Sequence, residues 1–139
     1  MYENASSLLC GVAEDRRNSP RVLVVDDNRD AAEMLSTILE AESIEARVAY
    51  TGAHALDLAW TWSPDVILLD LAMPGLDGFD VVRRIRSEEL FDHVGVIAVS
   101  GRSYSPEQAR DAGFIDFIRK PGSRDMIISA IYKHWHDRH

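Results

Sequence analysis

The chain has 139 residues, of which 46% are hydrophobic, and a formal net charge of −8. This length fits one globular domain with a full core and leaves little room for a second. The acidic balance disfavours direct nucleic-acid binding, because a basic surface is needed to hold a phosphate backbone. The single cysteine, Cys10, permits no internal disulfide and is typical of a reducing compartment.

The N-terminal segment mixes small polar and charged residues and ends before Pro20. We expect residues 1–19 to form a mobile arm and residues 20–139 to form the folded domain. The apolar run from Leu8 to Ala13 is too short for a signal peptide or a membrane span, and no basic segment precedes it. The sequence therefore predicts a cytoplasmic protein without membrane contact.

Apolar runs and helical periodicities alternate along the rest of the chain. The expected strands are 21–25, 45–49, 66–70, 94–99 and 114–118. Helices are expected between them and after the last, the fourth with a capping box from Ser105 to Gln108 and an end at Gly113. Five strands alternating with five helices predict an α/β fold, with right-handed crossovers and a doubly wound parallel sheet that has helices on both faces.

Polar side chains follow four of the five expected strands at their carboxyl ends. Asp26 and Asp27 follow the first strand, Asp70 the third, Ser100 the fourth and Lys120 the fifth. With strand order 2-1-3-4-5 the first and third strands are neighbours, so the three carboxylates meet at the switch point of the sheet. Like charges so close raise one another's pKa unless a cation neutralises them.

Mg²⁺ is the cation that fits this cluster, because it takes one or two carboxylates, a carbonyl oxygen and waters. We expect Asp27 and Asp70 to bind the metal directly. The backbone carbonyl of Ala72 is the expected third protein ligand, and Asp26 holds the waters of the ion.

The second carboxylate oxygen of Asp70 is then free to attack phosphorus. Phosphoryl transfer needs chiefly positioning and charge neutralisation, which the metal, Lys120 and the hydroxyl of Ser100 would supply around the equatorial oxygens. A purely structural ion cluster is the alternative, but charges gathered at one sheet edge without a ligand cost stability.

Taken together, the chain resembles the receiver domain of two-component response regulators, from Arg21 to about Trp135. The residues that carry the resemblance are Asp26-Asp27, Asp70, Met73-Pro74, Asp77-Gly78, Ser100-Gly101, Phe117 and Lys120-Pro121. The resemblance implies a flavodoxin-like fold and Mg²⁺-dependent transfer of a phosphoryl group onto Asp70. It implies a histidine kinase or a phosphotransfer protein as the donor.

The resemblance also implies a switch, in which Ser100 moves toward the phosphate and Phe117 turns inward. The face made by the fourth helix, fifth strand and fifth helix would change with it. The Lys120-Pro121 bond is expected to be cis. Ala72 and Arg102 occupy positions that flank the path of the hydrolytic water in receivers, so the lifetime of the acyl phosphate stays open.

The downstream protein target is not named by the sequence. Because the chain ends directly after the last helix, we expect a stand-alone receiver or one excised from a larger chain. The last helix also offers a face through which a homodimer could form. We expect no enzyme in the ordinary sense, since the chain would catalyse only its own phosphorylation and dephosphorylation.

Two other functions compete with this interpretation. A Mg²⁺-dependent phosphatase would use Asp70 as a transient nucleophile, as in the haloacid-dehalogenase type. Those enzymes need a second acid two residues later, where this chain has Ala72. A degenerate receiver acting as a scaffold is the other alternative, and the intact acid cluster argues against it.

Some surface and core residues carry expectations of their own. Trp60 and Trp62 are expected to cover the core, and Met126 to lie on the apolar side of the last helix. The arginines near the end of the third helix, Arg86 among them, are expected to point outward. The histidines at the C-terminus, His134, His136 and His139, are expected at a solvated end rather than around a metal.

Overall fold

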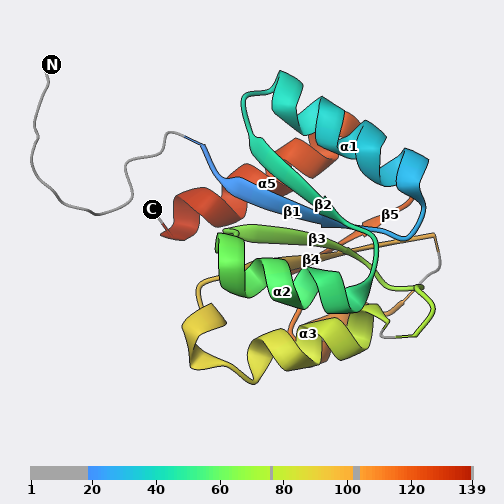
Figure 1. The fold of residues 1–139 in the computed structure, drawn as a ribbon, viewed down its shortest axis with the longest axis vertical. Helices are drawn as coiled ribbons and strands as arrows, with labels where there is room; N and C mark the ends of the chain where they lie inside the picture. Colours follow the sequence, from blue (N-terminus) through green and yellow to red (C-terminus); the bar gives the residue numbers. More distant parts are fainter. Residues whose placement is uncertain (1–18, 76, 102–103, 139) are drawn as a thin grey trace, which may run out of the picture.

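Five parallel strands form the centre of the structure, a computed structural model that describes residues 19–75, 77–101 and 104–138 (Figure 1). The strands are β1 (Arg21–Val25), β2 (Glu45–Ala49), β3 (Val66–Asp70), β4 (Gly95–Ser100) and β5 (Asp116–Arg119). Their order is β2-β1-β3-β4-β5, and every neighbouring pair is parallel. The predicted flavodoxin-like sheet is therefore confirmed.

Helices cover both faces of this sheet. They are α1 (Arg29–Ala41), α2 (Gly52–Trp62), α3 (Gly78–Arg86), α4 (Pro106–Ala112) and α5 (Arg124–Arg138), with a 3₁₀ turn η1 (Glu89–Phe91) before β4. Figure 1 shows α1 and α5 on one face and α2 and α3 on the other. Within the described ranges, no helix combines the length and apolar character needed to cross a membrane.

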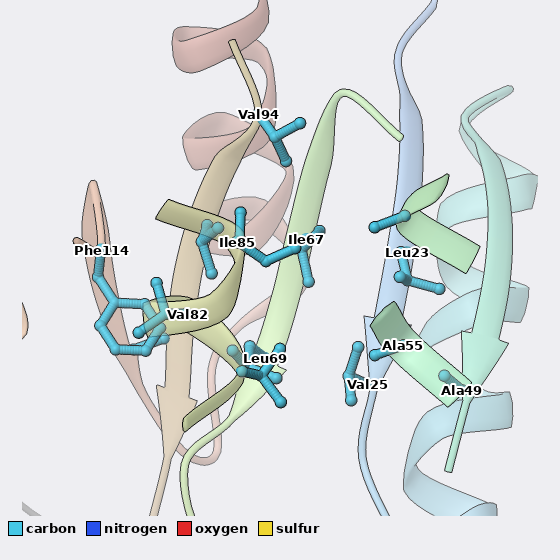
Figure 2. Close-up of a cluster of buried hydrophobic side chains, with 14 of the residues drawn as sticks. Leu23, Val25, Ala49, Ala55, Ile67, Leu69, Val82, Ile85, Val94 and Phe114 are labelled. Carbon is cyan, nitrogen blue, oxygen red and sulfur yellow. The ribbon is translucent and has the colours of Figure 1, made fainter. Parts of the chain in front are cut away.

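The strands alternate their side chains between the two layers of core. Leu23, Ile67 and Leu69 pack toward α2 and α3, as Figure 2 shows, while Val24 and Leu68 pack toward α1 and α5. All five residues of β3 are buried, which is why its sequence is a continuous apolar run rather than an alternating one. The rigid sheet that results fixes the position of whatever follows each strand.

The helices begin at the residues that their capping signals indicate. The side chain of Asn28 accepts a hydrogen bond from the backbone N–H of Ala31 at 3.1 Å, and this starts α1 directly after the acidic pair. The predicted capping box of α4 between Ser105 and Gln108 is confirmed. Gly113 ends α4 in the left-handed region, with φ of 112°, as expected for a C-terminal glycine.

The last two strands differ from their predicted bounds. β4 is shifted by one residue, and β5 begins at Asp116 rather than Phe114. The N–H of Phe114 donates to the carbonyl of Ala109 at the end of α4, so this residue still belongs to the helix cap. The turn η1 was not predicted, because three residues are too few for a periodic pattern.

Several side chains also lie elsewhere than expected. Trp62 is buried, but Trp60 is 52% exposed and Met126 is 54% exposed. Arg86 is half-buried, and its Nε donates to the carbonyl of Gly113 at 3.0 Å. The predictions for Trp60, Met126 and Arg86 were therefore wrong. Helical spacing gives the direction in which a side chain leaves its helix, but it does not tell whether another part of the chain covers that side chain.

The last turns of α5 pack against the rest of the fold, whereas a solvated end was predicted. Nε2 of His134 lies 3.3 Å from the carbonyl oxygen of His93, and the His134 ring lies against Gly95 at the start of β4. His134 is therefore less solvated than predicted, although this contact lies at the surface. The predictions for His139, for Cys10 and for the rest of residues 1–18 fall outside the described residues.

Candidate functional site

Three carboxylates meet where β1 and β3 end. Oxygens of Asp26, Asp27 and Asp70 all lie within 4.8 Å of one another. They meet because β1 and β3 are parallel neighbours in the register that places Val25 beside Leu69, so each strand delivers its next residues to the same edge. The residues that the sequence singled out are therefore adjacent in space.

One cation reaches this cluster from the far end of the chain. Nζ of Lys120 donates to Oδ2 of Asp26 at 2.9 Å and lies 3.8 Å from Oδ2 of Asp70. The Lys120-Pro121 peptide is cis, as predicted. The backbone N–H of Lys120 donates to the carbonyl of Ser100 at 2.8 Å, which ties the loop after β5 to the end of β4. Four strand ends thus contribute to one site.

Burial perturbs the carboxyl group of Asp70. Its residue is 8% exposed, and this burial raises the pKa of the carboxyl above its usual value. The neighbouring Asp26 raises that pKa further, whereas the N–H of Ala72, which donates to Oδ1 at 3.2 Å, and the ammonium of Lys120 lower it. The ionised form of Asp70 is therefore short of compensating positive charge.

The two carboxylates from β1 differ in their surroundings. Asp26 is buried, and its Oδ1 accepts a hydrogen bond from the N–H of Asn28 at 3.0 Å. Asp27 is exposed to solvent. Asp26, Asp70 and Lys120 also line a cavity of about 230 Å³, whose other walls are mainly apolar side chains of α1, α5 and the sheet. Although Asp70 is buried, it borders open space.

The loop after Asp70 can close only with glycine at its end. A Cβ on Gly78 would lie 2.6 Å from the carbonyl oxygen of Asp70 and 2.7 Å from Cα of Leu71, both backbone atoms that cannot move aside. The N–H of Gly78 donates to the carbonyl of Leu71 at 3.3 Å. This close approach explains the Asp77-Gly78 pair noted in the sequence, and it holds the start of α3 against the end of β3.

Ser100 and Phe117 occupy different environments. Ser100 is 1% exposed at the end of β4, beside the strand that carries Asp70. Phe117 on β5 is half-buried, and its ring centroid lies 6.1 Å from that of Tyr104. The Tyr104 ring in turn meets Phe79 of α3 at 5.5 Å. Sequence reasoning missed Tyr104, for which the only signal was an aromatic residue directly before the cap of α4.

The donor set of this cluster fits a hard divalent cation. Three carboxylates supply oxygen ligands, which Mg²⁺ prefers. Among the residues that the structure describes, Lys120 is the one cation paired with them, so they are under-neutralised. Within the described part of the chain, this is the group of three acids close enough to share an ion. The backbone N–H of Ala72 donates a hydrogen bond to Oδ1 of Asp70. The role of the Ala72 carbonyl as a ligand stays a prediction.

Comparison with known proteins places this geometry in a family. Residues 22–132 match the family model of the response regulator receiver domain. Over 116 residues the chain is 37% identical to response regulator PleD of Caulobacter vibrioides, and this match covers 81% of the chain and 25% of PleD. Over 115 residues it is 34% identical to response regulator MprA of Mycobacterium bovis, covering 81% of the chain and 49% of MprA. The chain therefore spans less than two thirds of these relatives.

A solved structure agrees with the sequence comparison. The Francisella response regulator 1452 receiver domain superposes with a TM-score of 0.80 at 30% identity, covering 87% of this chain and 100% of that one. Fold, strand order and matched residues point the same way, and the chain belongs to the receiver domain family of two-component response regulators.

Proposed function

We propose that Asp70 is the phosphoacceptor of a two-component phosphorelay and that Mg²⁺ binds beside it on Asp26, Asp27 and Asp70. Receiver domains are signalling modules rather than enzymes with separate substrates. The observation that carries the proposal is the convergence of three carboxylate oxygens within 4.8 Å, with Lys120 on one side. The donor would be a phosphohistidine of a histidine kinase or a phosphotransfer protein.

In the proposed reaction, an ionised oxygen of Asp70 attacks the phosphorus of the phosphohistidine. A P–O bond forms on Asp70, the P–N bond breaks, and its electron pair stays on the imidazole. Lys120 lies 3.8 Å from Oδ2 of Asp70, where its ammonium can contact an oxygen of the incoming phosphoryl group. A bound Mg²⁺ would supply further neutralisation of the carboxylate and phosphoryl charges.

The proposed output is a change in the surface of α4, β5 and α5. Ser100 ends β4 beside Asp70, so a small shift of its side chain would carry the state of the site into the sheet. Phe117 contacts Tyr104 on the α4 side of the sheet and is the residue through which the change would reach the surface. The downstream partner would be a protein that recognises this face.

Phosphorylation with a small donor tests the proposal. The wild-type chain incubated with Mg²⁺ and acetyl phosphate should gain the mass of one phosphoryl group, and chelation of the metal should abolish the gain. Asp70→Asn should show no gain, whereas Asp111→Asn, an exposed acid on α4, should be labelled like the wild type. Labelling of Asp70→Asn, or no labelling of the wild type, would contradict the proposal.

The same measurements separate the alternatives. Steady turnover of a phosphate ester would indicate the phosphatase, for which the position of Ala72 lacks the required acid. A folded chain that does not bind Mg²⁺ would indicate a scaffold.

For the switch, Ser100→Ala should still be phosphorylated, and the accompanying changes in NMR chemical shift on α4 and β5 should become smaller. If phosphorylation changed the chemical shifts of Ser100→Ala as much as those of the wild type, Ser100 would have no part in the switch.

A further inference from the structure

The surface where α2, α3 and η1 meet carries two exposed apolar side chains. Trp60 is 52% exposed and Leu90 is 68% exposed. The Trp60 ring is held in place by an edge contact with Phe91, with centroids 4.7 Å apart. Figure 1 shows η1 beside the ends of α2 and α3. Because η1 is the element before β4, this surface lies near the amino ends of the strands, whereas the acid cluster lies at their carboxyl ends.

This surface, which we call the α2/α3 patch, is hollowed. A depression of about 340 Å³ lies between the two helices, with Leu56 and Trp60 of α2 on one side and Phe91 at its end. Leu90 is the residue before Phe91; it is exposed and is not among the residues that line the depression. The patch therefore offers both a recess with apolar and polar side chains in its walls and a separate exposed apolar side chain.

Charges of both signs border the depression. Asp57 of α2, Arg84 of α3 and Glu88 all line it, and all three are exposed. No hydrogen bond or ion pair joins any of their side chains to another residue in the ranges 19–75, 77–101 and 104–138. One cation and two anions are thus available to a partner.

We propose that the α2/α3 patch is a contact between two copies of this chain, related by a two-fold axis. In such a contact every group meets its counterpart on the other copy, so the surface must be complementary to itself. Leu90 of each copy would enter the depression beside the partner's Trp60. Arg84 of each copy would pair with the partner's Asp57 and Glu88. A partner of one charge sign would leave either Arg84 or the two acids unpaired, which favours a second copy.

The size of the patch sets the expected affinity. It covers one end of two helices and a single turn, which is small for a stable complex, so the dimer should be weak and dependent on concentration. We expect a dissociation constant of roughly 10–100 μM. Because the patch lies near the amino ends of the strands and Asp70 lies at the carboxyl end of β3, dimerisation should not require the proposed phosphorylation.

Sedimentation equilibrium between about 1 μM and 1 mM chain tests this inference in the expected affinity range. Two variants give the charged residues of the patch a single sign. Arg84→Glu leaves only acids, and the double variant Asp57→Lys with Glu88→Lys leaves only bases. Each alone should raise the dissociation constant by about tenfold or more, because like charges then face each other. An equal mixture of the two should form a heterodimer at least as tight as the wild-type dimer.

Further variants separate the patch from other surfaces. Leu90→Ser should weaken the dimer, while Ile115→Ser, which is 46% exposed beside β5, should not. Arg110→Glu on α4 is the matched charge control and should leave the dimer intact. Asp70→Asn should dimerise like the wild type, which keeps this test apart from that of the proposed function. Circular dichroism verifies that each variant is folded.

Three results would overturn the inference. The first is a wild-type chain that stays monomeric at about 1 mM, since the expected dissociation constant is far lower. The second is a dimer that persists in Arg84→Glu. The third is a dimer lost in Arg110→Glu or Ile115→Ser but kept in the patch variants, because two copies would then meet through α4 and β5.

Discussion

Replacing Asp70 by asparagine should stabilise the fold in the absence of a divalent cation. At an effective dielectric constant of about 20, the ammonium of Lys120 attracts the Asp70 carboxylate by about 4 kcal/mol across 3.8 Å. Asp26 and Asp27 each repel it by about 3.5 kcal/mol or more, because their oxygens lie within 4.8 Å. The repulsion therefore exceeds the attraction.

Solvent reduces the size of this effect. Asp27 is exposed, so its share of the repulsion is screened, and the attraction by the partly exposed Lys120 is screened as well. Burial of Asp70 also disfavours its ionised form, as its raised pKa indicates, so we expect a net gain of about 1 kcal/mol in the free energy of unfolding. The amide of the variant can still accept the N–H of Ala72. For a domain of this size the gain corresponds to a rise of about 4 °C in Tm.

Thermal unfolding with a chelator at pH 7 and low salt measures this gain, with Asp111→Asn as the control that should leave Tm nearly unchanged. The advantage of Asp70→Asn should shrink as the pH falls. The raised pKa of Asp70 means that the folded wild type takes up a proton before the unfolded chain does, so its stability relative to the variant recovers as the pH falls from the raised pKa toward the ordinary value. A lower Tm for Asp70→Asn at pH 7 would refute the reasoning, since the attraction by Lys120 would then dominate.

Three further predictions concern the same site. Added Mg²⁺ should raise the Tm of the wild type, and Asp27→Asn should lose most of this rise in a thermal-shift titration; an equal rise in both would exclude Asp27 as a ligand. Lys120→Gln removes the cation from Asp26 and Asp70 and should cost about 2 kcal/mol in urea unfolding, a value reduced because Lys120 is partly exposed. Gly78→Ala places a methyl group against the backbone of Asp70 and Leu71 and should cost about 2 kcal/mol; an unchanged urea midpoint would show that the loop yields.

Much of the site could be predicted because it depends on topology more than on packing. A parallel sheet gathers the carboxyl ends of its strands at one edge, so residues placed directly after the strands meet whatever the details of the core. Asp26, Asp27, Asp70 and Lys120 follow this rule and lie together. The strand bounds could vary by one or two residues without separating them.

What could not be predicted depends on contacts distant in sequence. Asp65 is buried before β3, and its Oδ2 accepts the backbone N–H of Arg21 at 2.8 Å, a pairing that no local pattern reveals. Arg86 is drawn inward by the carbonyls of Gly113 and Phe91. Periodicity reports the direction in which a side chain leaves its helix, whereas its partners are set by the assembled fold.

The ion pair between Lys120 and Asp26 joins residues that are 94 positions apart. Because the cation follows β5, which is the last of the five strands of this sheet in sequence order, a chain in which β5 has not docked would present the acids without this counterion. If Lys120 contacts the phosphoryl group as proposed, phosphorylation would begin only when the segment after β5 docks. The separation of these two residues along the chain would then make completion of this fold a precondition for phosphorylation.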